Sequence, residues 1–169
     1  MGVDPAPAGR NARRLTGRVA QARDILATLA VLRPALVRID RPWRIIGSAA
    51  LVLHGIRDVV ARDIDLMLDP DDAAMLIDQA GFVRQPQDDR GPFRSHVHAR
   101  RDDLPMPVEV MGGFAFRNPD GLHPVRVDAP ILHDGWPVAS LPDLTAMLRL
   151  FDRPKDRLRL SLIAESAVT

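Results

Sequence analysis

Two aspartates separated by one residue, Asp63 and Asp65, constrain the fold of this chain more than any other feature. The apolar residues around them, up to position 68, predict a β-strand. Because strand side chains alternate between faces, both carboxylates would point to one face and Ile64 to the core. Two carboxylates held this close repel each other unless a cation lies between them, and oxygen ligands suit Mg²⁺ or Mn²⁺. The pair alone also fits a solvated strand edge, so its surroundings decide the interpretation.

Upstream of the pair, a strand predicted over residues 43–46 ends in Gly47-Ser48. Residues 49–54 then predict a short helix with Ser48 as its N-cap and Gly55 as its stop. Glycine lets a backbone approach a phosphate closely, and a helix start offers free N–H groups to an anion. The same dipeptide also suits an ordinary strand-to-helix turn.

Downstream, Glu109 stands between apolar neighbours in a strand predicted over residues 107–111. A lone acid in an apolar strand costs free energy unless it is paired, exposed or bound to metal. Glu109 is therefore a candidate third carboxylate, with a surface position on an edge strand as the alternative.

The rest of the chain alternates between helical and extended patterns. Residues 1–11 predict a disordered tail and residues 12–169 a single domain. Helices are predicted over residues 12–37 with a break near Pro34, over 70–79 after the cap Asp69, over 141–150 after Ser140, and over 155–166. Further strands are predicted over residues 93–99, 114–117, 123–127 and 136–138. This order predicts an α/β (α+β) fold, a mixed twisted β-sheet flanked by helices, with C-terminal helices.

Composition excludes several classes of protein. The chain has no cysteine, which rules out disulfides and thiolate metal sites. No apolar run approaches the roughly 20 residues of a membrane span, and the N-terminus lacks the apolar core of a signal peptide. A cytoplasmic location without membrane contact is the resulting expectation. A net charge of +1 and an aromatic content of 4% argue against a strongly basic or base-stacking nucleic-acid binder.

Taken together, these segments resemble the nucleotidyltransferase superfamily, the polymerase-beta-like fold. The matching stretch is WRIIGSAALVLHGIR at residues 43–57, followed by Asp63-Ile64-Asp65-Leu66. Near the C-terminus, Arg153-Pro154-Lys155-Asp156 resembles the Arg-x-Lys-Asp element of small bacterial members. The resemblance is strong over residues 43–68 and loose over the remainder to residue 164.

The resemblance implies metal-dependent transfer of a nucleoside monophosphate from a triphosphate such as ATP to a hydroxyl acceptor. It assigns Mg²⁺ or Mn²⁺ to Asp63, Asp65 and Glu109, with Glu109 also a candidate general base. The residues that it assigns to nucleotide binding are Gly47, Ser48, Arg57, Arg62 and Lys155. Without this resemblance, Arg57, Arg62 and Lys155 would each be interpreted as solvated surface residues.

Two positions depart from the family pattern. Arg159 stands where the family often has an acid, and Glu109 replaces the commoner aspartate.

Three functions stay open: an active enzyme that modifies a small molecule, an RNA end or a protein; a catalytically degenerate binding module; and a toxin–antitoxin component that needs a partner chain. The expected partners are a nucleoside triphosphate, an acceptor that the sequence does not identify, and a second copy or an antitoxin-like chain.

Overall fold

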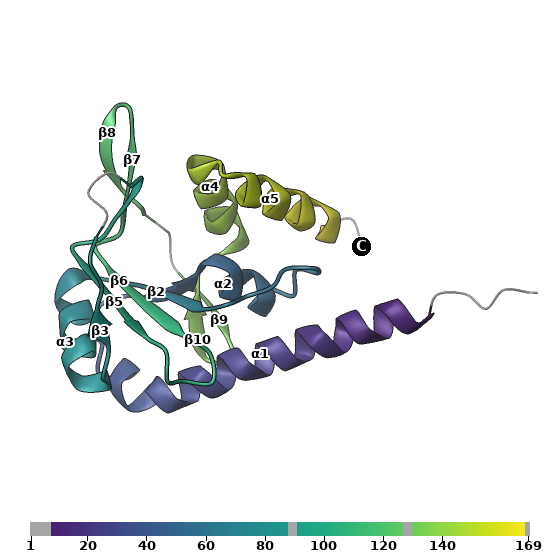
Figure 1. The fold of residues 1–169 in the computed structure, drawn as a ribbon, viewed down its shortest axis with the longest axis horizontal. Coiled ribbons are helices and arrows are strands. Elements are labelled where there is room, and N and C mark those ends of the chain that lie inside the picture. Colours follow the sequence, from purple (N-terminus) through teal and green to yellow (C-terminus); the bar gives the residue numbers. More distant parts are fainter. Residues whose placement is uncertain (1–7, 88–90, 127–129, 168–169) are drawn as a thin grey trace, which may run out of the picture.

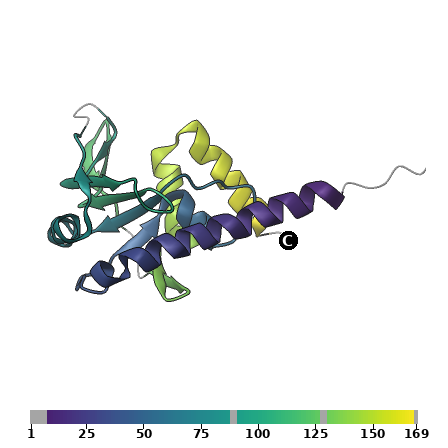
Figure 2. The same ribbon diagram turned by 60° about the horizontal axis from the view of Figure 1, so that its bottom comes forward.

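The computed structural model describes residues 8–87, 91–126 and 130–167, with side chains from residue 21 onward. Its first element is the long helix α1 (Ala8–Leu36), whose N-terminal turns extend past the rest of the domain (Figures 1 and 2). The predicted tail lies outside the described residues over positions 1–7, and α1 includes positions 8–11. Pro34 lies inside the helix, which continues to Leu36, so the predicted break is wrong.

Within the described residues, a seven-stranded mixed sheet forms the centre of the fold (Figure 1). Its strands, in spatial order, are β3 (Val83–Arg84), β5 (Val97–Arg101), β6 (Val108–Gly112), β2 (Ile64–Leu68), β1 (Arg44–Ile46), β10 (Trp136–Val138) and β9 (Ile131–His133). The pairs β2–β6 and β1–β10 are parallel and the others antiparallel. This confirms the predicted mixed sheet.

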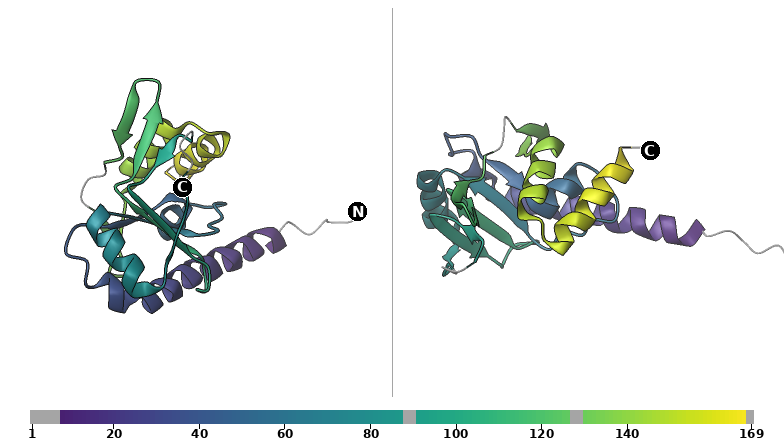
Figure 3. Two further views of the ribbon diagram at one scale, coloured as in Figure 1. Left: turned by 60° about the vertical axis from the view of Figure 1, so that its left-hand side comes forward. Right: turned by 90° about the horizontal axis from the view of Figure 1, so that it is seen from above.

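Helices cover the two faces of this sheet. Helix α1 and helix α3 (Pro70–Ala80) lie on one side, and α4 (Leu141–Phe151) with α5 (Pro154–Ser166) lie on the other (Figures 1 and 3). The short helix α2 (Gly47–Leu53) contacts both α1 and α4. The C-terminal helices of the predicted fold class are therefore present, as are the helices flanking the sheet.

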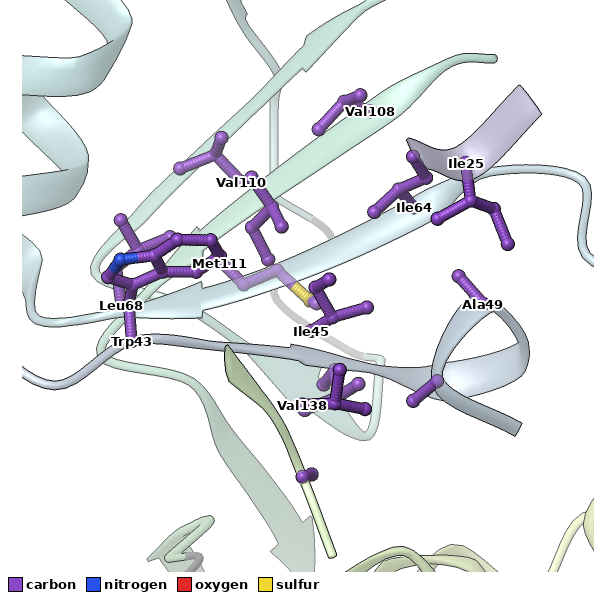
Figure 4. Close-up of a cluster of buried hydrophobic side chains, with 14 of the residues drawn as sticks. Ile25, Trp43, Ile45, Ala49, Ile64, Leu68, Val108, Val110, Met111 and Val138 are labelled. Carbon is purple, nitrogen blue, oxygen red and sulfur yellow. The ribbon is translucent and has the colours of Figure 1, made fainter. Parts of the chain in front are cut away.

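The apolar core lies between α1 and the sheet. On α1 the residues Ile25, Leu29, Leu32 and Leu36 recur at helical spacing and are almost fully buried. Figure 4 shows Ile25 beside the core-facing side chains of β2 and β6. The core residues of these strands and their neighbours are Ile45, Ile64, Leu66, Val108, Val110 and Val138. Since alternate residues of β2 point into this core, Asp65 points to the opposite face.

A second, three-stranded sheet stands beside the first. It contains β4 (Phe93–Arg94), β7 (Ala115–Asn118) and β8 (Gly121–Pro124), with β7 and β8 joined as a hairpin. The single strand predicted over residues 93–99 is wrong, because β4 pairs with β7 while β5 pairs with β6 in the other sheet. The strands predicted over residues 114–117 and 123–127 form this hairpin as β7 and β8, although β8 begins earlier than predicted, at Gly121, and position 127 lies outside the described residues.

Local capping chemistry is confirmed at two helices and wrong at one. Asp69 accepts a hydrogen bond from the Asp71 N–H at the start of α3, and Ser140 accepts one from the Asp143 N–H at the start of α4. Ser48, by contrast, does not cap α2, because that helix begins one residue earlier, at Gly47. Every helix among the described residues is too short or too polar to cross a bilayer.

Candidate active site

Three carboxylates meet on the sheet face that points away from α1. Asp65 on β2 and Glu109 on β6 occupy paired positions of neighbouring parallel strands, so their side chains leave the sheet side by side. Asp63 directly precedes β2 rather than lying within it. All three line one cavity of about 540 Å³. The structure thus brings the predicted carboxylates together.

The cavity is lined by both polar and apolar residues. Besides the carboxylates, its polar lining consists of Gly47, Ser48, Gln87, Arg94, Ser95, His98, Arg153, Lys155 and Arg159. The apolar part is lined by Leu51, Phe93, Met111, Phe114, Leu144, Met147, Leu148 and Phe151. Helix α4 supplies four of these residues, and β4 of the second sheet supplies Phe93. A ligand with one charged and one flat, apolar portion fits such a cavity.

Asp65 is the most strongly perturbed acid of the site. Burial, followed by the charges of Asp63 and Glu109, raises its pKa to about 7. Residue Asp65 keeps partial solvent exposure at the cavity floor, yet protein surrounds its carboxyl closely. Arg159 and Lys155 oppose the rise in pKa without cancelling it. A cation beside this carboxyl would lower its pKa and favour its ionised form.

Glu109 is neutralised differently. His98 Nε2 lies 3.6 Å from Glu109 Oε2, and Arg100 Nη1 donates to Glu109 Oε1 at 2.5 Å. These two neighbours hold the pKa of Glu109 below its usual range, although burial opposes them. The same Arg100 nitrogen lies 3.5 Å from Asp63 Oδ2. Arg100 is therefore a cation of the protein itself placed between two of the three carboxylates.

Gly47 fits tightly against Asp65. Its φ of +69° is in the left-handed region, and a Cβ built on it would lie 2.1 Å from Asp65 Oδ2. The glycine is thus required by the approach of the backbone to the carboxylate. Ser48, which follows it, is buried, and its Oγ accepts a hydrogen bond from Arg159 Nη2.

The predicted nucleotide-binding cations divide into two groups. Lys155, in the first turn of α5, lines the cavity near the carboxylates. Arg57 and Arg62 are exposed on the segment between α2 and β2, and neither is among the described residues that line the cavity. The geometry therefore brings together Lys155 and the acids, with Arg57 and Arg62 outside.

Sequence reasoning did not assign Arg100 or Arg159 to the site. Arg100 opposes Glu109 in the antiparallel pair β5–β6, a register that the sequence does not reveal. Arg159 carried a signal, since it was a cation at a position where an acid was expected. Its four-residue spacing from Lys155 places both on one face of a helix.

The donor chemistry of the site fits a divalent cation. Carboxylate oxygens are the ligands that Mg²⁺ and Mn²⁺ prefer, and three carboxylates line one cavity here. Among the described residues, however, no three acidic or histidine side chains are arranged to hold a metal as they stand. Glu109 is occupied by Arg100. Metal binding by all three carboxylates therefore requires Arg100 to release Glu109.

Comparisons with known proteins agree on the fold. No protein-family model matches this sequence, and none of the curated proteins compared with it matches. Among solved structures, a candidate nucleotidyltransferase of Thermotoga maritima, TM1012, superposes with a TM-score of 0.62 at 22% identity, over 85% of this chain and 94% of that one. The antibiotic-resistance factor ANT(2'')-Ia superposes with a TM-score of 0.53 at 15% identity, over 88% and 85%. The chain thus has a nucleotidyltransferase-like fold.

Proposed function

We propose that this protein transfers a nucleoside monophosphate from a nucleoside triphosphate to a hydroxyl acceptor, with Mg²⁺ or Mn²⁺ as cofactor. One observation carries the proposal: the half-buried Asp65 lines one cavity together with Asp63 and Glu109, and Ser48 and Lys155 line the same cavity. The fold shared with TM1012 and ANT(2'')-Ia supports it.

The metal would be held by Asp63, Asp65 and Glu109, and when bound it would supply Lewis-acid stabilisation of the reacting phosphate and its leaving group. Asp65, whose pKa is raised to about 7 chiefly by burial, would give up its proton as the cation enters, because a nearby positive charge favours the carboxylate. Glu109, which is paired with Asp65 on the neighbouring strand, is also the candidate to accept the proton of the acceptor hydroxyl. Lys155 would neutralise charge on the phosphates.

The apolar residues that line the cavity suit a planar ring. Among the described residues, four of the chain's five phenylalanines form one cluster, consisting of Phe93, Phe114, Phe116 and Phe151. The Arg153 guanidinium lies 4.6 Å from the centre of the Phe93 ring. A nucleobase or a flat part of the acceptor would stack there.

A binding module without catalysis is the second candidate. The contact between Arg100 and Glu109 favours it, because a resident guanidinium can neutralise the carboxylates without metal. In that case the protein would bind a nucleotide and release no pyrophosphate. If a second copy or an antitoxin-like chain completes the acceptor site, the protein is still an enzyme, as in the first proposal.

The test uses the full chain with Mg²⁺ or Mn²⁺ and each nucleoside triphosphate. We expect metal-dependent thermal stabilisation, and pyrophosphate release once an acceptor from a panel of RNA ends, small hydroxylated molecules and proteins is added. The double variant D63A/D65A should lose both. Asp71→Ala is the matched control, because Asp71 is an 83% exposed carboxylate beyond the other end of β2. Metal-dependent nucleotide binding without pyrophosphate release would favour the binding module, and no nucleotide binding would reject both.

A further inference from the structure

The side of α5 that lines the cavity carries two cations, Lys155 and Arg159, and the nearby acid on this helix, Asp156, cannot neutralise both. Lys155 and Arg159 are four residues apart on α5, so they lie on one side of the helix, and both line the cavity. Their charges act on Asp65, whose pKa they lower. Figure 1 shows α5 above α2, the helix that begins with Gly47 and Ser48. The cations of α5 thus line the same cavity as the carboxylates of β2 and β6.

A buried acid holds Arg159 in place. Asp156 is fully buried and accepts hydrogen bonds from the Arg153 backbone N–H at 3.1 Å and from its Nε at 2.6 Å. Asp156 Oδ1 also lies 3.6 Å from Arg159 Nη1. One carboxylate therefore serves two guanidiniums, which leaves net positive charge beside the cavity. Arg153 is further fixed over Phe93 and Phe151.

The other end of the Arg159 guanidinium reaches α2. Nη2 donates to Ser48 Oγ, and Ser48 is the residue after Gly47, which touches Asp65. The Arg159 side chain is only 20% exposed. Burial lowers its pKa, but an arginine remains charged, so the protein keeps a partly desolvated cation at this position. Partial desolvation strengthens the interaction of such a cation with an anion.

We propose that Arg159 is a phosphate-binding residue, whose guanidinium, fixed between Asp156 and Ser48, binds the polyphosphate of the incoming nucleoside triphosphate. This inference rests on the proposed function and extends it to a residue at which an acid was expected. A polyphosphate would lie between the carboxylates and α5. Metal held by the carboxylates would neutralise one side of it, and Lys155 and Arg159 would neutralise the other. The planar guanidinium suits paired hydrogen bonds to phosphate oxygens.

The test measures binding of inorganic tripolyphosphate with Mg²⁺ to the full chain by titration calorimetry. Because this probe has no base and no acceptor is added, it reports the polyphosphate site alone. We expect Arg159→Gln to weaken binding at least tenfold, the loss typical of a charged hydrogen bond of about 1.5–3 kcal/mol. Arg157→Gln is the matched control, since Arg157 lies on the same helix, is 66% exposed and pairs with Asp152. It should bind like the wild type.

The outcomes separate the inference from the proposed function. If the wild-type protein does not bind tripolyphosphate with metal, the proposed function fails. If it binds and Arg159→Gln binds within about twofold of it, the role of Arg159 is overturned and the proposed function stands.

A second measurement needs no variant and covers the case in which Arg159→Gln does not fold. The wild-type protein is treated with phenylglyoxal, and modified arginines are located by peptide mass spectrometry. Tripolyphosphate with Mg²⁺ should protect Arg159 and leave the modification of Arg157 unchanged. Modification of Arg159 at an undiminished rate under saturating tripolyphosphate would overturn the inference.

Discussion

At the scale of single residues, the closest fit in the site is that between Gly47 and Asp65. We predict that Gly47→Ala displaces the Asp65 carboxylate, because the new Cβ would lie 2.1 Å from Oδ2. The variant should lose metal-dependent nucleotide binding and should unfold at a lower temperature. Its positive φ alone contributes about 1–2 kcal/mol of strain. Thermal denaturation with and without Mg²⁺ and triphosphate measures both effects.

Gly55 provides the control for this prediction. It also has a positive φ, +79°, but a Cβ built on it meets no atom within 4 Å. Gly55→Ala should therefore show the loss of stability caused by backbone strain and retain nucleotide binding. Equal nucleotide binding by the two variants would show that the contact with Asp65 does not matter.

Arg100 is the second residue with a specific prediction. Arg100→Gln should lower the stability of the metal-free protein by about 1–3 kcal/mol at pH 7, since it removes the hydrogen bond to Glu109. The same change should increase the affinity for Mg²⁺ or Mn²⁺, because the metal no longer competes with a guanidinium. Urea denaturation and metal titration test the two parts. Unchanged metal affinity would show that Arg100 does not occupy the metal's place.

The site was partly predictable from the sequence at this scale. Alternation along β2 predicted that Asp65 points away from the core, and Glu109 stood out as an acid between apolar neighbours; that the two occupy paired positions of β2 and β6 follows only from the register of these strands. Arg100 could not be found, because its contact with Glu109 depends on the register between β5 and β6. Arg159 reaches Ser48 from 111 positions away, and only the packing of α5 over α2 brings the two together.

At the scale of elements, the phenylalanine cluster joins the second sheet to α4. Phe93 on β4 contacts the rings of Phe114, Phe116 and Phe151, the last of these at the end of α4. We predict that Phe93→Ala destabilises the protein by about 2–4 kcal/mol, because it removes the central ring of the cluster. Chemical denaturation measures this loss.

The same variant should also weaken nucleotide binding more than tripolyphosphate binding. Phe93 lines the apolar part of the cavity, whereas tripolyphosphate has no ring to stack on it. Phe82 is the control, since it is a buried phenylalanine that does not line the cavity. Phe82→Ala should lose stability without this difference between the two ligands.

Elements with their own local signals were predictable, and those defined by pairing were not. Asp69 and Ser140 marked the starts of α3 and α4, because capping depends on neighbours in sequence. Strands β3 and β9 were missed, since each has two or three residues and gains its identity from a partner strand. The low aromatic content also gave no sign of the cluster, which gathers rings from three separate elements.

At the scale of the whole molecule, the sheet separates an apolar core face from a face that bears the carboxylates. One face of β2 and β6 supplies core residues to α1 and α3, and the other supplies carboxylates to the cavity. The rigid core thus fixes the backbone from which Asp65 and Glu109 project. Strand β2 carries buried apolar side chains on one face and Asp65 on the other, so a change at Asp65 should affect the free energy of unfolding as well as the candidate site.

The acid Asp65 makes the stability of the metal-free protein depend on pH. Its pKa is about 7 in the folded state against 3.8 for an unperturbed aspartate, so the unfolded chain releases this proton at lower pH. Between about pH 4 and pH 7 the native state holds more protons, and the contribution of Asp65 to stability therefore falls as the pH rises. Above about pH 7 the full penalty is present.

Asp65→Asn should remove this penalty. We predict that the metal-free variant is more stable than the wild type at pH 8, by roughly 2–4 kcal/mol, since each unit of pKa shift corresponds to about 1.4 kcal/mol. Near pH 4 the two proteins should be equally stable. Mg²⁺ with a triphosphate should stabilise the wild type at pH 8 and leave the variant unaffected. Urea denaturation at both pH values decides the matter: a variant less stable than the wild type at pH 8 would mean that the protein already compensates the Asp65 charge without a metal.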